Sequence, residues 1–208
     1  MKSENGRSMV EMLGVLAIIG VLSVGAIAGY SKAMMKYKLN RHAEAVNMLI
    51  NNVLSIKDKL PRNQTGVIYY NTLLSKLNLL PDGIVKLDET SLEDKYFNNI
   101  ISITYSAGDP SLSSFLFWIG RSSSDHTLES CYNIIKVAKE NAANVWFVRT
   151  YKHYSDGSGK PSDNLETFYG DAYCNTGYIC LRNITLNNLE KACQSCKDGY
   201  CSIGIFWK

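Results

Sequence analysis

Apolar residues fill one unbroken stretch near the start of the chain. Residues 12–31 carry no charge, and their polar members are Ser23, Tyr30 and Ser31. A helix rises about 1.5 Å per residue, so this stretch would be about 30 Å long, the thickness of a bilayer's hydrocarbon core. The pattern therefore predicts a helix that can span a membrane.

The next stretch is amphipathic and shows no helix breaker before Pro61. Its apolar residues recur near a period of 3.6, which is typical of a helix with one buried face. They are Leu39, Ala43, Val46, Ile50, Val53 and Leu60. We therefore expect one helix over residues 7–60, about 80 Å long. Its first half would lie in a membrane or a helical bundle, and its second half would pack on a globular head. A span followed by a separate stalk helix is the alternative.

The remaining residues, 61–208, are expected to form that head. Residues 61–100 should hold a short helix around 69–77 and a turn at Pro81-Asp82-Gly83. Beyond them we expect a helix over 128–142, capped by Asp125 or Thr127, and another over 185–195. Strands are predicted at 101–105, 115–119, 145–151, 178–184 and 203–207, and a long exposed loop at 154–172. The predicted fold is α+β, with an antiparallel sheet packed on the long helix.

Composition and cysteine content narrow the class of protein. The net charge of +3 is too small and too dispersed to indicate nucleic-acid binding. Six cysteines all follow the apolar stretch, and an even count in an exported domain indicates disulfides, with 15 possible connectivities. They are Cys131, Cys174, Cys180, Cys193, Cys196 and Cys201. Disulfides would place the head in an oxidising compartment.

Gly6, at the end of a short polar leader, is followed five residues later by Glu11 at the edge of the apolar stretch. This combination resembles the prepilin signature of the type IV pilin superfamily, and the residues after the long helix are similar to those of type IVb pilins. The resemblance implies a leader over 1–6, cleavage between Gly6 and Arg7, and methylation of the new amino group. An ordinary secretory signal would instead lose its apolar part. Arg7 stands where the family most often has an aromatic or apolar residue, and the span has no proline.

The resemblance also implies roles for single residues. Glu11 would form a salt bridge with the α-amino group of Arg7 in a neighbouring subunit and so fix the stagger between subunits. The alternative is that Glu11 lies among lipid headgroups and needs no partner. Pilins commonly close a large C-terminal loop with a disulfide. The resemblance therefore implies that Cys131 pairs with Cys193. That leaves Cys174 with Cys180 and Cys196 with Cys201, across short loops rich in turn residues.

Other candidate chemistry is weaker. Cys193 and Cys196 have the CxxC spacing of a zinc or redox site, but no second pair follows, and His42, His126 and His153 lie far away in sequence. Residues 122–126 contain the residue types of a hydrolase triad, yet neighbours in sequence cannot adopt triad geometry. We therefore expect no enzyme activity, metal or cofactor. Four tyrosines are either a binding surface or ordinary half-buried sheet residues: Tyr151, Tyr154, Tyr169 and Tyr173. Gly25 and Gly29 are spaced for close helix contact or simply fill the span.

The function implied by the resemblance is that of a structural subunit of a type IV pilus-like filament, serving adhesion, motility or surface contact. Its partners would be copies of itself, other pilins, prepilin peptidase, an inner-membrane assembly platform and membrane lipid. It would lie in a bacterial inner membrane before assembly and in an extracellular filament afterwards. The alternatives are a type II secretion pseudopilin and a non-polymerising single-pass membrane protein with a disulfide-rich binding head.

One pattern favours the opposite orientation. Four cationic residues follow the apolar stretch within ten positions, and the positive-inside rule would place that side in the cytoplasm. They are Lys32, Lys36, Lys38 and Arg41. We give more weight to the cysteines and the leader, which both indicate an exported head.

Overall fold

The computed structural model describes residues 9–59, 67–106, 113–120, 126–153, 161–197 and 200–207. One helix, α1 (Met9–Ile56), continues into the 3₁₀ turn η1 (Lys57–Lys59). This confirms one uninterrupted helix over those residues, in place of a span and a separate stalk. The chain forms two compact units that divide inside α1, Met1–Lys38 and Leu39–Lys208.

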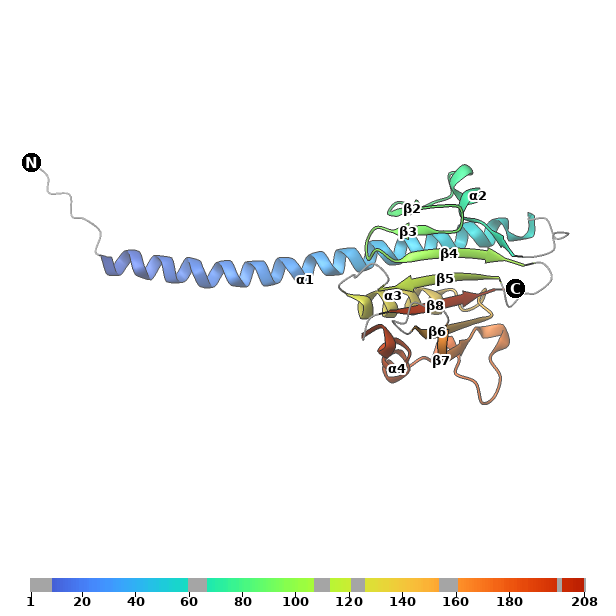
Figure 1. Ribbon diagram of the computed structural model, residues 1–208. Helices are drawn as coiled ribbons and strands as arrows, with labels where there is room; N and C mark the ends of the chain where they lie inside the picture. The colour runs from blue at the N-terminus through green and yellow to red at the C-terminus, as the bar shows by residue number, and fades with distance from the viewer. Residues whose placement is uncertain are drawn as a thin grey trace, which may run out of the picture. The chain divides into compact units, whose positions relative to one another are not determined.

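The head, from Leu39 onward, is built on one antiparallel sheet (Figure 1). The described strands are β1 (Ile68–Tyr69), β2 (Ile84–Lys86), β3 (Leu92–Asp94), β4 (Ile100–Tyr105), β5 (Ser114–Ile119), β6 (Phe147–His153), β7 (Pro161–Tyr169) and β8 (Cys201–Phe206). Their order is β2-β3-β4-β5-β8-β6-β7, with β1 also paired to β4. The last strand therefore lies in the middle, where Ile203 faces Phe117 of β5 and Ile205 faces Val148 of β6.

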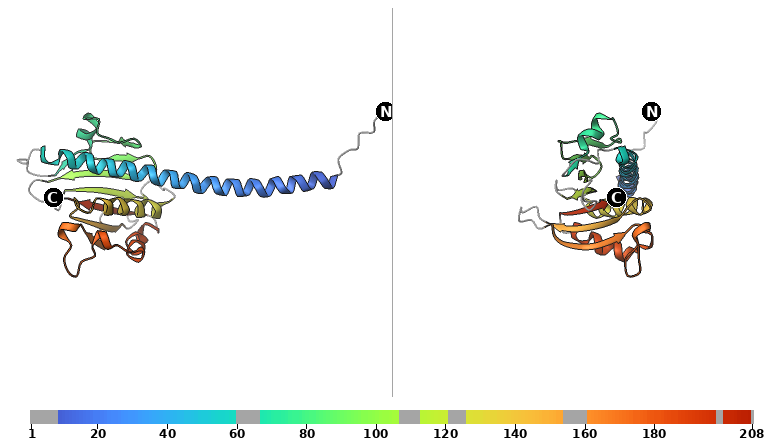
Figure 2. Two further views of the ribbon diagram at one scale, coloured as in Figure 1. Left: turned by 180° about the vertical axis from the view of Figure 1, so that it is seen from behind. Right: turned by 90° about the vertical axis from the view of Figure 1, so that its right-hand side faces the viewer.

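Helices cover one face of this sheet. They are the head portion of α1, α3 (Thr127–Glu140) and α4 (Leu186–Lys197), while α2 (Asn71–Lys76) packs near β2 (Figures 1 and 2). The core between these layers holds fully buried side chains of α1, β4, β5, α3 and β8. They include Val46, Leu49, Ile50, Val53, Ile101, Ile103, Phe115, Phe117, Ile134, Ile135, Ile203 and Ile205. Each such burial contributes roughly 1.5–3 kcal/mol to folding, before chain entropy is counted. The predicted α+β class is confirmed.

The turn predicted at 81–83 is present, and its glycine is required. Ile84 N donates to Pro81 O at 3.0 Å, and Gly83 has a φ of 83°, in the left-handed region. A Cβ on Gly83 would also lie 2.3 Å from the ring of Tyr96. The short helix predicted near this turn is α2. The strands β1, β2 and β3 were not predicted, because two or three residues carry too short an alternation to detect.

Two of the predicted elements are wrong. Much of the expected loop at 154–172 is the strand β7, an edge strand whose polar sequence lacks the apolar alternation of a half-buried strand. Residues 178–184 form no strand: Cys180 makes one isolated bridge to Tyr169, and the 3₁₀ turn η4 (Leu181–Asn183) follows. The disulfide Cys174–Cys180 closes this segment into a short loop, which leaves no extended run to pair.

The predicted cap of α3 is also wrong. His126, with a φ of 75°, precedes the first helical residue, Thr127. The hydroxyl of Thr127 does not cap its own helix but donates to Cys196 O of α4 at 2.5 Å. Asp125 lies outside the described residues, as do the triad-like positions 122–125 and Tyr154.

Candidate functional site

The apolar part of α1 exposes its hydrophobic side chains. Val10, Leu16 and Ile27 are 76%, 62% and 66% exposed, and every residue from Met9 to Met34 is exposed. By length and composition this is the one helix among the described residues that is able to cross a membrane. A continuous exposed apolar surface of this extent is typical of a segment covered by lipid or by other protein.

The few polar and small residues of this segment suit an apolar environment. The hydroxyl of Ser23 donates to Ile19 O at 2.8 Å, so its donor is satisfied within the helix. Four glycines, Gly14, Gly20, Gly25 and Gly29, would each accept a Cβ with no atom within 4 Å. No close packing within the described residues therefore requires glycine at these four positions. Gly25 and Gly29 lie one turn apart on the same side of the helix, where a second helix is able to approach closely.

Glu11 lies in the first turn of α1 and is solvent-exposed. A carboxylate at this end of a helix interacts favourably with the helix dipole. Gly6 and Arg7 lie outside the described residues, so the predicted cleavage site and methylation site have no structural description. The predicted pairing of Glu11 with the amino group of Arg7 stays a prediction.

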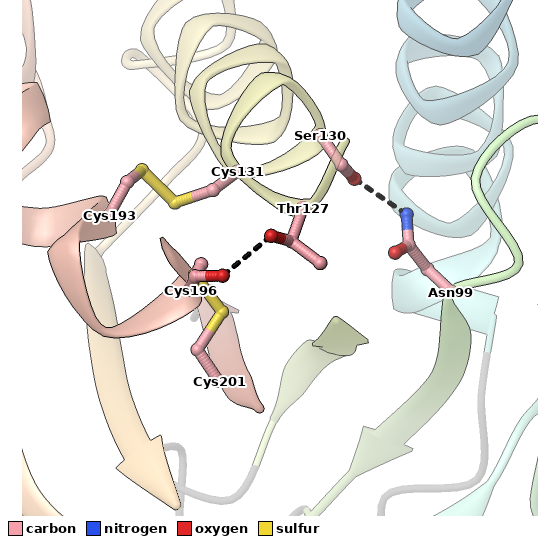
Figure 3. The surroundings of a disulfide bond; sticks show 7 residues. All are labelled: Asn99, Thr127, Ser130, Cys131, Cys193, Cys196 and Cys201. Atoms are coloured by element: carbon pink, nitrogen blue, oxygen red, sulfur yellow. Dashed lines mark hydrogen bonds between the residues drawn. A yellow bond between two sulfur atoms is a disulfide. The ribbon is translucent and has the colours of Figure 1, made fainter. Parts of the chain in front are cut away.

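Three disulfides hold the C-terminal half of the head. Cys131–Cys193 joins α3 to α4 with a Cα–Cα distance of 5.9 Å, and Cys196–Cys201 joins α4 to β8 (Figure 3). Cys174–Cys180 closes a local loop. These are the same three pairs that the sequence and the resemblance suggested. Cys193 and Cys196 each bond a different helix or strand, so the CxxC spacing forms no site of its own. A long N-terminal apolar helix, an antiparallel sheet and C-terminal disulfides together make a pilin-like architecture.

The sequence did not reveal a cluster of buried polar side chains under α1. His42 and Asp94 are both fully buried, and His42 Nε2 lies 3.4 Å from Asp94 Oδ2. Asp94 accepts hydrogen bonds from the backbone N–H groups of Tyr96 (2.8 Å) and Phe97 (3.2 Å), and from Asn99 Nδ2 (3.1 Å). Asn99 Nδ2 also donates to Ser130 Oγ of α3 at 2.8 Å (Figure 3). The cluster therefore connects α1, β3 and α3.

Asn133 of α3 determines which nitrogen of His42 carries the proton. Its amide donates to Leu39 O at 2.9 Å and to Nδ1 of His42 at 2.8 Å. Because Nδ1 accepts, the neutral imidazole carries its proton on Nε2, which faces Asp94. Burial lowers the pKa of His42 to about 3. Burial also raises the pKa of Asp94 to about 6, against the opposing effect of its three hydrogen-bond donors.

These two shifts give opposite pH dependences, which predicts a result for single variants. A raised carboxyl pKa stabilises the fold below pH 4, and this contribution is lost as pH rises through 6. A lowered histidine pKa stabilises it above pH 6.5, and this contribution is lost as pH falls toward 3. In the parent chain, the changes in stability from Asp94 and His42 have opposite signs, so they largely cancel between pH 4 and 6. Compared with the parent chain, His42→Gln should gain about 3 kcal/mol of stability on acidification from pH 6.5 to 4, and Asp94→Asn should lose about 3 kcal/mol.

The measurement is the free energy of unfolding of the full chain in detergent, at four pH values from 4 to 7, with the parent value subtracted at each. Subtraction removes the titration of all other groups. If the two difference curves slope in the same direction, the opposite pH dependences inferred for His42 and Asp94 are wrong.

Three of the four tyrosines proposed as a binding surface are half-buried. Tyr151, Tyr169 and Tyr173 belong to β6, the end of β7 and the 3₁₀ turn η3 (Asp171–Tyr173). The ring of Tyr169 stacks on Tyr178 with centroids 4.2 Å apart. These positions match ordinary packing at one edge of the sheet, which was the other interpretation of the pattern.

Comparisons with known proteins add no family assignment. No family model matches the chain, and no curated protein matches it significantly. The pilin-like architecture therefore stands on the helix, the sheet and the disulfides of this chain.

Proposed function

We propose that the chain is a structural subunit of a type IV pilus-like filament. The observation that carries this proposal is the division of one continuous helix, α1, into two parts. The apolar part is exposed among the described residues, whereas the part from Leu39 onward packs on a disulfide-bonded head. Bundled copies of the apolar part would bury that surface against one another and replace lipid. The prepilin-like signature at Gly6 and Glu11 supports the same function.

In this proposal, prepilin peptidase removes residues 1–6, and the chain is held in an inner membrane until it is assembled into the filament. The three disulfides favour an oxidising, exported location for the head over the cytoplasmic one that Lys32, Lys36 and Lys38 would indicate. Glu11 would fix the register between neighbours. The proposal covers major and minor pilins. A type II secretion pseudopilin would share these parts and is the alternative within the same family.

The proposal predicts that processing depends on Gly6. A Gly6→Val variant, expressed in the native host, should keep residues 1–6, remain in the membrane fraction and yield no sheared surface filaments. The reason is that a branched side chain at the cleaved bond blocks access to the peptide, while the apolar stretch still inserts. Gly20→Ala, a glycine change inside the span, is the matched control and should be processed normally.

Electron microscopy of the sheared fraction, labelled with antibody against the head, gives the readout. Filaments labelled in the parent and absent from Gly6→Val support the proposal. A parent chain that is abundant in the membrane but appears in no filament would favour the non-polymerising membrane protein.

A further inference from the structure

The turn between β2 and β3 presents a rigid acidic tip. Leu87 is 56% exposed there, next to the exposed carboxylates of Asp88 and Glu89. Asp88 Oδ1 accepts hydrogen bonds from Thr90 N at 2.7 Å and from Thr90 Oγ1 at 3.0 Å, and Ser102 of β4 donates to Thr90 O at 2.7 Å. The hydrogen bonds from Thr90 lower the pKa of Asp88, which keeps the carboxylate charged. An ordered tip loses little freedom when it binds.

A groove of matching character lies between α3 and α4. Its volume is about 510 Å³, within the range of sites that bind a ligand or a protruding side chain. Its apolar lining includes Leu186, which is 85% exposed, and its charged rim belongs to α3. The groove is lined by residues that include Ile184, Leu186, Leu189, Lys136, Lys139 and Glu140. The disulfide Cys131–Cys193 holds the two helices at a fixed separation, so the groove is also preformed.

The charges of the tip and the groove are complementary. The tip carries two carboxylates beside Leu87, and Lys86 of β2 is its neighbouring cation. The groove rim carries two ammonium groups, Lys136 and Lys139, which lie one helical turn apart, against the single carboxylate of Glu140. The tip therefore presents an apolar side chain flanked by negative charge, and the groove presents an apolar lining flanked by positive charge. Complementary charges across an interface disfavour the binding of other partners and fix the register of the two surfaces.

The tip and the groove of one head lie at opposite ends of the sheet. β2 and β3 form one end of the strand order, whereas α4 contacts β6, β7 and β8 toward the other end (Figure 1). The tip of one copy is therefore able to meet only the groove of another. A contact between two different surfaces of identical chains does not close on itself unless it forms a ring, and it otherwise produces an open helical array.

We propose that the β2–β3 tip of one copy docks into the α3–α4 groove of the next, with Leu87 in the groove and Glu89 beside Lys136 and Lys139. This inference rests on the proposed filament function and names the head surfaces that would join its subunits. It is independent of Glu11 and of the apolar helix, because every residue involved belongs to the head.

A photo-crosslinking experiment on the full chain tests the contact. Leu87 is replaced by benzoylphenylalanine in cells that assemble filaments, and the crosslinked peptides are mapped by mass spectrometry. The expected product joins position 87 to residues 135–140 or 184–189 of a second copy. The same probe at Val67, which is 44% exposed and precedes β1, outside the tip, should not label those residues.

Charge reversal then tests the complementarity. Lys136→Glu combined with Lys139→Glu should reduce the crosslinked dimer roughly fivefold, and adding Glu89→Lys should restore part of it. Lys76→Glu, on the exposed face of α2, is the matched control and should have no effect. Intact disulfides in each variant confirm that the head still folds.

The outcomes separate the two proposals. Filaments whose crosslinks from position 87 map to another surface, to a different protein or to nothing would overturn the docking contact and leave the filament function standing. A parent chain that forms no filaments and no crosslinked second copy would overturn both.

Discussion

Replacing Glu11 with alanine should reduce surface filaments by more than about tenfold while the chain still enters the membrane. An unpaired carboxylate in the apolar interior of a bundle costs about 2.5–3.5 kcal/mol, so a filament that retains one requires a cationic partner for it. In the proposed filament that partner is the amino group of Arg7 in a neighbouring copy. Removing the carboxylate leaves this amino group buried and unpaired, and it also removes the interaction that fixes the stagger.

Three further variants separate charge from helix stability. Glu11→Asp keeps the charge and should retain part of the assembly, whereas Glu11→Gln should behave like alanine. Glu44→Ala, which removes an exposed carboxylate paired with Arg41 at 3.0 Å farther along the same helix, is the control and should assemble normally. Filaments are counted in the sheared fraction, and the chain is quantified in the membrane fraction. Normal assembly of Glu11→Ala would place this carboxylate among lipid headgroups and refute its role.

Removal of the Cys131–Cys193 disulfide should have the largest effect on the stability of the head. The bond closes a sequence separation of 62, and the chain-entropy relation gives a loss of roughly 4 kcal/mol when both cysteines become alanine. Both side chains are fully buried between α3 and α4, so the change also loosens the packing of these helices.

The Cys174–Cys180 bond supplies the matched control. Its sequence separation is 6, and its cysteines are half-buried, so the double alanine variant should lose only about 2 kcal/mol. Unfolding of the full chain by denaturant in detergent, under non-reducing conditions, measures both. Equal losses for the two pairs would show that loop length does not govern the stabilisation.

The long helix and the class of fold could be predicted because their signals are local and strong. The apolar stretch and the period of Val46, Ile50 and Val53 each depend only on residues close in sequence, and the structure buries those three side chains. The central strand β8 was predicted from its alternation of Ile203 and Ile205. Its position between β5 and β6 was not, because strand order depends on contacts across the whole head.

The errors lie where tertiary contacts override local pattern. β7 has a polar sequence, and it forms a strand because β6 offers it hydrogen-bonding partners at the sheet edge. His42 was noted only as too distant from the cysteines for a metal site. Its signal was available, since it stands on the same face of α1 as the buried Ala45, Val46 and Leu49. Asp94 gave no such signal, because its buried partner His42 lies far away in the sequence, on α1.

The N-terminus and intact mass of the protein purified from its native host test the filament account most directly. The account predicts a chain that begins at methylated Arg7 and whose mass lacks six hydrogens for three disulfides. That result would establish prepilin processing and an oxidised, exported head in one spectrum. A chain that still begins at Met1 with free thiols would contradict the account and leave a single-pass membrane protein whose head faces the cytoplasm.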